Sequence, residues 1–168
     1  CLEPNLIVGF AGDLGFAQRF RQVLKDVWNP QSIPALEQGE AHKVISAFCT
    51  GGLTEYLSTH QNNFPVNVQT AFLVGFVHKN KHHLVHLHAG LFQPMVINAS
   101  MPFVSIGSGY HITNPFLSFI KKVFWQEQEV PTLQVGIFSA ILAINLAIEI
   151  NCGGINAPLH LAVLKYDE

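Results

Sequence analysis

Two kinds of apolar pattern divide the chain into predicted strands and helices. A continuous apolar run over residues 6–12, closed by glycine, predicts a buried strand. The next apolar side chains recur at the spacing of an amphipathic helix face, at Phe16, Phe20, Val23, Leu24 and Val27. Asn29-Pro30 ends this helix, because the residue before a proline disfavours the helical conformation. A second helix is expected over about residues 40–60, with a kink or break at Gly51-Gly52.

The middle of the chain predicts strands. Runs at residues 70–77 and 83–89 read as two strands, and Lys79-Asn80-Lys81 between them indicates a hairpin turn. Shorter apolar runs at residues 95–99 and 103–106 predict two more strands. The sheet-forming part of the sequence therefore ends just before a glycine-rich turn at residues 107–109.

The last third predicts two helices and a closing strand. Asn114 is the expected N-cap of the first helix, with Pro115 at its first position. Thr132 is the expected N-cap of the second, which runs to about Ile150, and residues 159–164 read as a strand. This order indicates an α/β (α+β) fold in which helix pairs pack on sheets, rather than an alternating βαβ repeat. We find no linker and expect residues 1–168 to form a single domain.

Composition narrows the surroundings of the protein. Apolar residues make up 49% of the 168, and charged residues only 12%. So few charges indicate either a large core or a surface that is buried against other subunits. The net charge of −2 gives no excess of positive charge that would bind the phosphates of a nucleic acid. The cysteines at positions 1, 49 and 152 lack metal-site spacing and favour reduced thiols in a cytoplasmic setting. We see no signal peptide. The apolar run 135–144 is too short for a membrane span and predicts a buried core helix.

Three motifs carry a resemblance to a known family. They are residues 5–12, the Ser-Ile-Gly-Ser-Gly turn at 105–109, and the Glu-Ile-Asn-Cys-Gly-Gly turn at 149–154. Their order and separation, with a helix pair between the two turns, resemble proteasome-type subunits and the related bacterial ring peptidases. The resemblance implies the four-layer αββα sandwich of N-terminal-nucleophile hydrolases. The family's first strand pair, which carries the nucleophile, has no counterpart here, so the expected fold is N-terminally incomplete.

The resemblance also implies supporting site residues. In the family an N-terminal Thr attacks the peptide carbonyl with its own α-amine as base. By position, Ser108 matches the family's Gly-Ser-Gly serine, Glu149 its Asp, and Cys152 its later Ser. Compared with the family's Asp, Glu149 keeps the negative charge on a side chain that is one methylene longer. Compared with the family's Ser, Cys152 offers a weak thiol donor in place of a strong hydroxyl donor. Both departures count against ordinary threonine-peptidase activity. The alternative for Ser108 is a structural hydroxyl at a helix entry.

The resulting prediction is a subunit of a proteasome-like, threonine-type peptidase ring that hydrolyses amides with a nucleophile this chain does not display. The alternative is a non-catalytic structural or partner-binding subunit of an oligomeric ring. Expected partners are the other subunits and, if active, a peptide or protein substrate; no cofactor, metal, nucleic acid or membrane is expected. Three explanations fit the missing strand pair. The chain is a fragment or processed form of a longer subunit, the strands are supplied by another chain, or the protein is a degenerate, non-catalytic relative.

Two groups of residues suggest other chemistry. Cys1 invites a role as a terminal nucleophile, but Pro4 interrupts the strand that should follow it. The even parity of His82, His86 and His88 allows them to share one strand face and offer ligands to a metal. No acidic residue lies near them in sequence, so a polar face toward solvent or a neighbouring subunit is the favoured interpretation.

Overall fold

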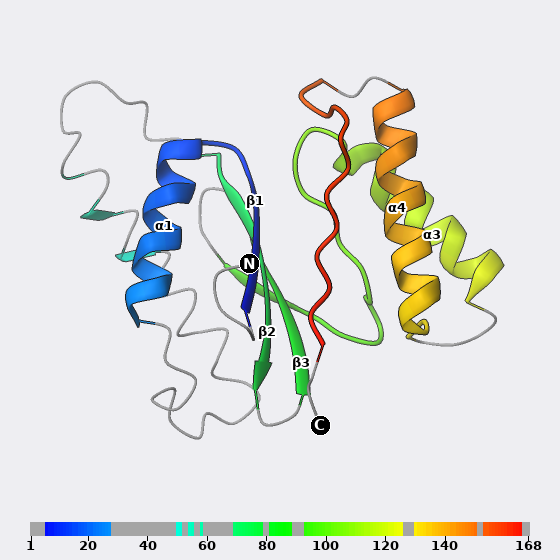
Figure 1. The fold of residues 1–168 in the computed structure, drawn as a ribbon, viewed down its shortest axis with the longest axis horizontal. Helices are drawn as coiled ribbons and strands as arrows, with labels where there is room; N and C mark the ends of the chain where they lie inside the picture. The colour runs from blue at the N-terminus through cyan, green and yellow to red at the C-terminus, as the bar shows by residue number, and fades with distance from the viewer. Residues whose placement is uncertain are drawn as a thin grey trace. The chain divides into compact units, whose positions relative to one another are not determined.

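The computed structural model describes residues 6–27, 50, 51, 54, 55, 58, 69–78, 81–88, 93–125, 130–150 and 153–165. Its elements in chain order are β1 (Leu6–Ala11), α1 (Leu14–Val27), β2 (Ala71–His78), β3 (Lys81–Leu87), β4 (Pro94–Ile97), α3 (Tyr110–Phe124) and α4 (Leu133–Glu149) (Figure 1). The α+β class is confirmed. The chain divides into two units, one of Cys1–Val96 with Ala162–Glu168 and one of Ile97–Leu161. The single domain over residues 1–168 stays a prediction.

The first unit is built on a four-stranded sheet in the order β1-β2-β3-β4. β1 runs antiparallel to β2, and β2 antiparallel to β3. The register places Val74 of β2 between Val8 of β1 and Val85 of β3. Because side chains alternate across a strand, this register puts the buried apolar side chains of the three strands on one face.

The core of this unit lies between that face and α1. The side chains buried there are Leu6, Phe16, Ala17, Phe20, Leu24, Phe72, Val74, Phe76, Val85 and Leu87. The ring of Phe72 lies 4.2 Å from that of Phe20 and 5.8 Å from that of Phe16, measured between centroids. Each large side chain buried in this way stabilises the fold by about 1.5–3 kcal/mol. The helix face predicted from the sequence is therefore confirmed at Phe16, Phe20 and Leu24.

The start of α1 is held by Asp13. Its carboxylate accepts a hydrogen bond from the backbone N–H of Phe16 at 2.6 Å, as an N-cap does. Its own backbone N–H donates to the hydroxyl of Thr70 at 2.9 Å. Thr70 is buried just before β2. These two bonds tie the turn between β1 and α1 to the neighbouring strand.

The second unit contains a helical hairpin of α3 and α4. The end of α3 lies beside the first half of α4, since the indole N–H of Trp125 donates to the hydroxyl of Ser139 at 3.2 Å. The rings of Phe124 and Phe138 meet edge to face at 5.8 Å. Thr132 caps α4 by accepting from the N–H of Val135, as predicted.

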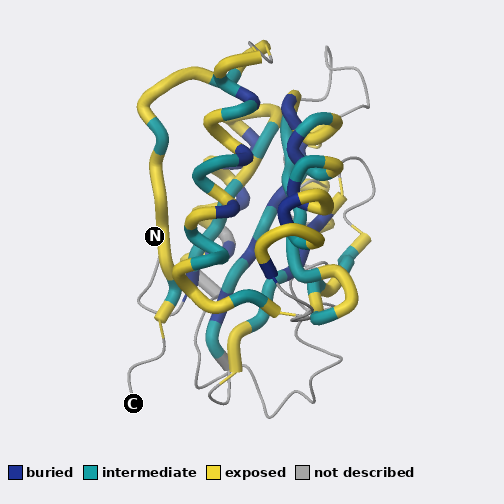
Figure 2. Tube along the Cα trace, turned by 90° about the vertical axis from the view of Figure 1, so that its right-hand side faces the viewer, coloured by how far each residue is buried: buried dark blue, intermediate teal, exposed yellow. Residues whose placement is uncertain are grey.

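The helix predicted at residues 135–144 is present within α4, but in the part of the chain that the structure describes it is buried on one side only and is not a core helix. Its buried residues are Ser139, Ala143 and Ala147. Phe138 and Ile144 are exposed. Figure 2 shows buried and exposed positions alternating along the helices.

Two predicted strands are absent. Residues 103–106 are not a strand, because the backbone N–H and the hydroxyl of Ser105 both donate to the side-chain oxygen of Asn114. The polar groups of Ser105 thus bond to a helix instead of a strand. Residues 159–164 are likewise not a strand and are mostly exposed (Figure 2). An apolar pattern in the sequence indicates side chains suited to a strand. It does not show whether a neighbouring strand is present to pair with the backbone.

The predicted start of α3 at Asn114 is also wrong. The helix begins at Tyr110, with Gly109 as N-cap and Pro115 inside it. The hydroxyl of Thr113 donates to the Gly109 carbonyl at 3.0 Å. The side-chain oxygen of Asn114 accepts a hydrogen bond from the Ser105 hydroxyl instead of capping the helix. These bonds hold an extra turn ahead of Pro115, although a proline inside a helix removes one backbone hydrogen bond.

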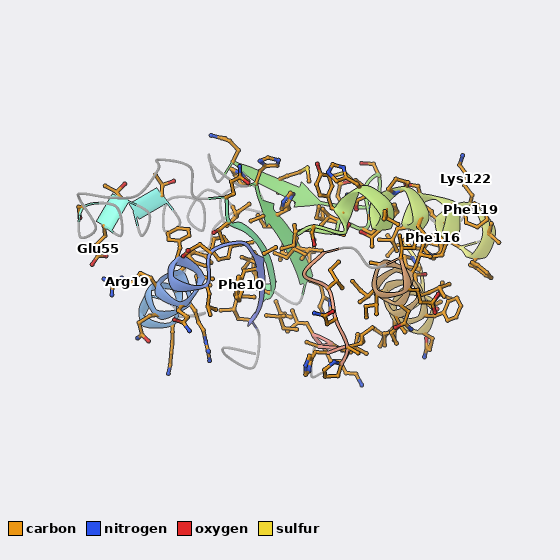
Figure 3. The ribbon with its side chains drawn as sticks, turned by 90° about the horizontal axis from the view of Figure 1, so that it is seen from above. Phe10, Arg19, Glu55, Phe116, Phe119 and Lys122 are labelled. Carbon is orange, nitrogen blue, oxygen red and sulfur yellow. The ribbon has the colours of Figure 1, made fainter. Side chains whose placement is uncertain are left out.

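Some predictions fall mainly outside the described residues. The helix expected at 40–60 is described only at residues 50, 51, 54, 55 and 58, all helical. Within this stretch Glu55 forms an ion pair with Arg19 of α1 (Figure 3). Lys79 and Asn80 of the expected hairpin turn also lie outside. The described residues form one sheet, so they do not establish the two-sheet core of a four-layer sandwich.

Candidate functional site

Ser108 lies in the turn that leads into α3. Gly107 has a positive φ of 91°, which reverses the chain there. The Ser108 hydroxyl is exposed and donates a hydrogen bond to the backbone carbonyl of Gly153. This bond joins the 105–109 turn to the 149–154 turn. The two turns therefore lie together at one end of the α3–α4 helix pair.

The second turn begins where α4 ends. Glu149 is the last residue of α4 and is exposed. Gly154 has a φ of 82°, which favours glycine, and a Cβ there would lie 3.9 Å from the Ser108 hydroxyl oxygen. Cys152 lies outside the described residues. The structure therefore brings Ser108 to Gly153 and Gly154, and it puts Glu149 on the helix end that leads into the same turn.

The chemistry open to Ser108 follows from its partner. A serine becomes a nucleophile when a neighbouring base accepts its proton. Here the acceptor is a backbone carbonyl, which is not a base at neutral pH. The hydrogen bond therefore holds two turns together without activating the hydroxyl. Its oxygen can still accept a hydrogen bond from a further group.

Sequence reasoning missed a polar cluster at the entry to α3. The hydroxyl of Ser105 contacts both the hydroxyl of Thr113 and the side-chain oxygen of Asn114. Thr113 is buried, and its hydroxyl bonds the Gly109 carbonyl. A serine eight residues before a Thr-Asn pair has no recognisable pattern, so only the fold could reveal this cluster. It fixes the segment that ends in Ser108.

The histidines of β3 have different surroundings. His82 and His88 are exposed, whereas His86 is 8% exposed. Burial, and to a smaller extent the neighbouring His88, lowers the pKa of His86. The His86 and His88 rings lie 5.8 Å apart. Across the described part of the chain, no three His, Cys, Asp or Glu side chains converge as metal ligands would.

Two other sequence features can be placed only in part. Cys1, the possible terminal nucleophile, is outside the described residues. As for membrane spans, none of the helices in the described ranges is long and apolar enough to cross a bilayer.

Neither a family model nor a curated protein matches the sequence. Solved structures do match in fold. One is the helical assembly of the Anbu complex from Pseudomonas aeruginosa, 14% identical, with a TM-score of 0.64 over 88% of this chain and 60% of that one. Another is Anbu, the ancestral beta-subunit, from Yersinia bercovieri, 15% identical, with a TM-score of 0.57 over 84% of this chain and 58% of that one.

These matches correct the family suggested by the motifs. The assignment to proteasome-type subunits in general was wrong, because the matched structures are Anbu proteins, a specific proteasome-like group. At such low identity the similarity concerns the fold alone. The chain spans about 60% of the length of these Anbu structures. What the comparison establishes is that the described elements follow the fold of an Anbu subunit.

Proposed function

We propose that the protein is a subunit of a self-assembling complex of the Anbu kind. The observation that carries the proposal is the fold match to the Anbu complex over 88% of the chain. The composition supports it, since 12% charged residues leave little surface suited to water. The partners would be further copies of the subunit or closely related chains.

A finer part of the proposal concerns architecture and chemistry. The fold would be one domain, a four-layer sandwich in which a second sheet covers the α3–α4 hairpin. Amide hydrolysis would take place beside the joined turns, with Ser108, Glu149 and Cys152 as supporting residues and a peptide as substrate. The tie between Ser108 and Gly153 supports this part, because it would hold two walls of such a site in register.

The second candidate is a subunit without catalytic activity. It is favoured by the same hydrogen bond, since the Ser108 hydroxyl is used to join two turns. The replacement of the family's Asp and Ser by Glu149 and Cys152 points the same way. In this case the protein would shape the assembly and bind partners.

Assembly is tested by sedimentation and negative-stain microscopy of the untagged protein at micromolar concentration. We expect particles of many subunits, as rings or helical arrays. A stable monomer across this range would contradict the proposal.

Hydrolysis is tested with a panel of fluorogenic peptides on the assembled protein. If the turns support an active site, Ser108→Ala should lower turnover at least tenfold while the particles stay intact. Ser118→Ala, which removes a hydroxyl that bonds within α3, is the matched control. Assembled particles without turnover, or with turnover that ignores Ser108, would favour the structural subunit.

A further inference from the structure

His86 is a buried polar side chain on the face of the sheet that lies away from α1. Val85 and Leu87, on either side of it in β3, belong to the core under α1, so the alternation of side chains turns His86 to the opposite face. Its exposed fraction is only 8%. Its Nδ1 is buried and has no hydrogen-bond partner among the described residues. Buried polar atoms without a partner are rare in folded proteins, and each requires an explanation.

A second histidine lies directly beside this one. His88 follows His86 by two residues, and their ring centroids are 5.8 Å apart with 57° between the ring planes. His88 is exposed, and its backbone N–H donates to the carbonyl of Gln93 at 3.4 Å. The pair therefore extends from a buried nitrogen to the solvent, on a segment whose end is held by a backbone hydrogen bond.

The separation of the two rings suits a shared metal ion. Histidine nitrogens bind zinc at about 2.0–2.1 Å, which puts two imidazole centres about 4.5–6.5 Å apart for bond angles between about 90° and 180° at the metal. The observed 5.8 Å lies within this range. Because both rings are on one short segment, the second coordination bond forms at a high effective concentration.

The other histidines of β3 do not belong to this pair. His82 lies four residues before His86, which is about 13 Å along a strand at 3.3 Å per residue. His83 pairs with Phe76 of the core, and the two rings stack with their centroids 5.0 Å apart. The described residues bring no third His, Cys, Asp or Glu ligand to the pair. The remaining coordination positions are therefore left to water or to a small exchangeable ligand.

The ligand type selects the class of metal. Imidazole suits copper, nickel and zinc, whereas Mg²⁺ and Ca²⁺ take oxygen ligands. For a given set of nitrogen ligands the affinity is highest for Cu²⁺ and lower for Zn²⁺. Two imidazoles completed by water are thus a site for a late divalent transition metal.

We propose that His86 and His88 form a two-histidine site for a divalent transition-metal ion, which binds Cu²⁺ more tightly than Zn²⁺. The sequence alone favoured a polar face here, since no acidic residue lies near these histidines. The structure adds the contact between the two rings and the buried nitrogen that lacks a partner. The inference goes beyond the proposed function, because it needs neither assembly nor hydrolysis.

The first test titrates Cu²⁺ into the untagged, chelator-treated full chain at about pH 7.5, where histidine ligands are deprotonated. Calorimetry measures the affinity, and electron paramagnetic resonance counts the nitrogens bound to copper. We expect one tight equivalent with two imidazole nitrogens. His88→Ala should weaken it at least tenfold and leave one such nitrogen, because a single imidazole cannot chelate. The matched control His82→Ala, another exposed histidine of this segment, should change neither readout.

The second test addresses the buried ligand. His86→Gln should also weaken the copper equivalent at least tenfold, and circular dichroism in the presence of chelator checks that the variant is folded. His88 is exposed, so His88→Ala decides the question if His86→Gln does not fold. Metal bound to the folded chain stabilises it. We therefore expect one equivalent of Cu²⁺ to raise the urea midpoint of the parent and of His82→Ala, but not that of His88→Ala.

Three results would overturn the inference. One is copper bound equally well by the parent and by both His86→Gln and His88→Ala, since the ion would then sit on other histidines. Another is a parent spectrum with a single imidazole nitrogen, and the third is Mg²⁺ bound as tightly as Cu²⁺. Sedimentation of the same samples keeps the proposed function separate, because a monomer with the copper site would refute assembly and uphold the site.

Discussion

The hydroxyl of Ser108 donates to the carbonyl of Gly153 across 45 residues of chain. Between these residues lie both helices of the hairpin, whose other end is held by Trp125 and Ser139. The bond thus closes the open end of the hairpin. It fixes the two turns that the sequence singles out as a candidate site.

Removing this tie should loosen the hairpin. We expect Ser108→Ala to lower the free energy of unfolding by about 1 kcal/mol, the usual net contribution of one hydrogen bond. Thermal unfolding followed by circular dichroism measures the change. Ser118→Ala, which removes a local bond to Asn114 on the same helix, should cost less. Equal losses for the two variants would show that the long-range tie contributes nothing special.

Ser139→Ala should be more costly, because it leaves a buried donor without its acceptor. Trp125 is 3% exposed, and its indole N–H donates to the Ser139 hydroxyl. An unsatisfied buried group costs about 1–3 kcal/mol. Trp125→Phe removes the donor as well, so the double variant should lose less than the sum of the two single ones. Additive losses in urea unfolding would contradict a direct coupling.

Local patterns predicted the elements whose determinants are close in sequence. An apolar run predicted a strand at residues 6–12, and Thr132 predicted the start of a helix that runs to about Ile150. The structure has β1 at Leu6–Ala11 and α4 at Leu133–Glu149. The face of α1 followed from the spacing of Phe16, Phe20 and Leu24. In each case a short stretch of side chains decides the conformation of that same stretch.

The predictions were wrong where contacts with residues distant in sequence decide the local conformation. Asn114 has the composition of an N-cap, but its side chain bonds Ser105, nine residues earlier, and the helix starts before it. Residues 159–164 have a strand's apolar content but no ladder. The candidate site shows both sides of this limit. Its turns could be located from glycine spacing, whereas the partner of the Ser108 hydroxyl could not.

Gly12→Ala should strongly destabilise the fold. The φ of Gly12 is 124°, a conformation that alanine rarely adopts, and a Cβ would lie 2.2 Å from the carbonyl oxygen of Gln69. We expect a loss of several kcal/mol, since backbone strain and a clash with backbone act together. Urea unfolding measures it.

The matched control for this change is Gly136→Ala. Gly136 lies inside α4, and a Cβ there would meet only a proline side-chain atom at an ordinary 3.7 Å. Helix propensity then predicts a gain of up to about 1 kcal/mol. A Gly12→Ala variant as stable as the parent would show that the turn between β1 and α1 relaxes freely.

The stability of the sheet should fall in mild acid because of His86. Burial and the neighbouring His88 hold the pKa of His86 below its ordinary value of 6.5, and Nδ1 has no hydrogen-bond partner among the described residues. Below pH 6.5 the unfolded chain binds a proton that the folded chain resists, so stability present above that pH is progressively lost as the pH falls. His86→Leu should flatten this dependence between pH 7.5 and 5.5, as measured by the urea midpoint at each pH. His82→Leu, at an exposed position of the same strand, should keep the parental slope. If His86→Leu keeps the parental slope too, the acid sensitivity has another source, and the buried imidazole does not control it.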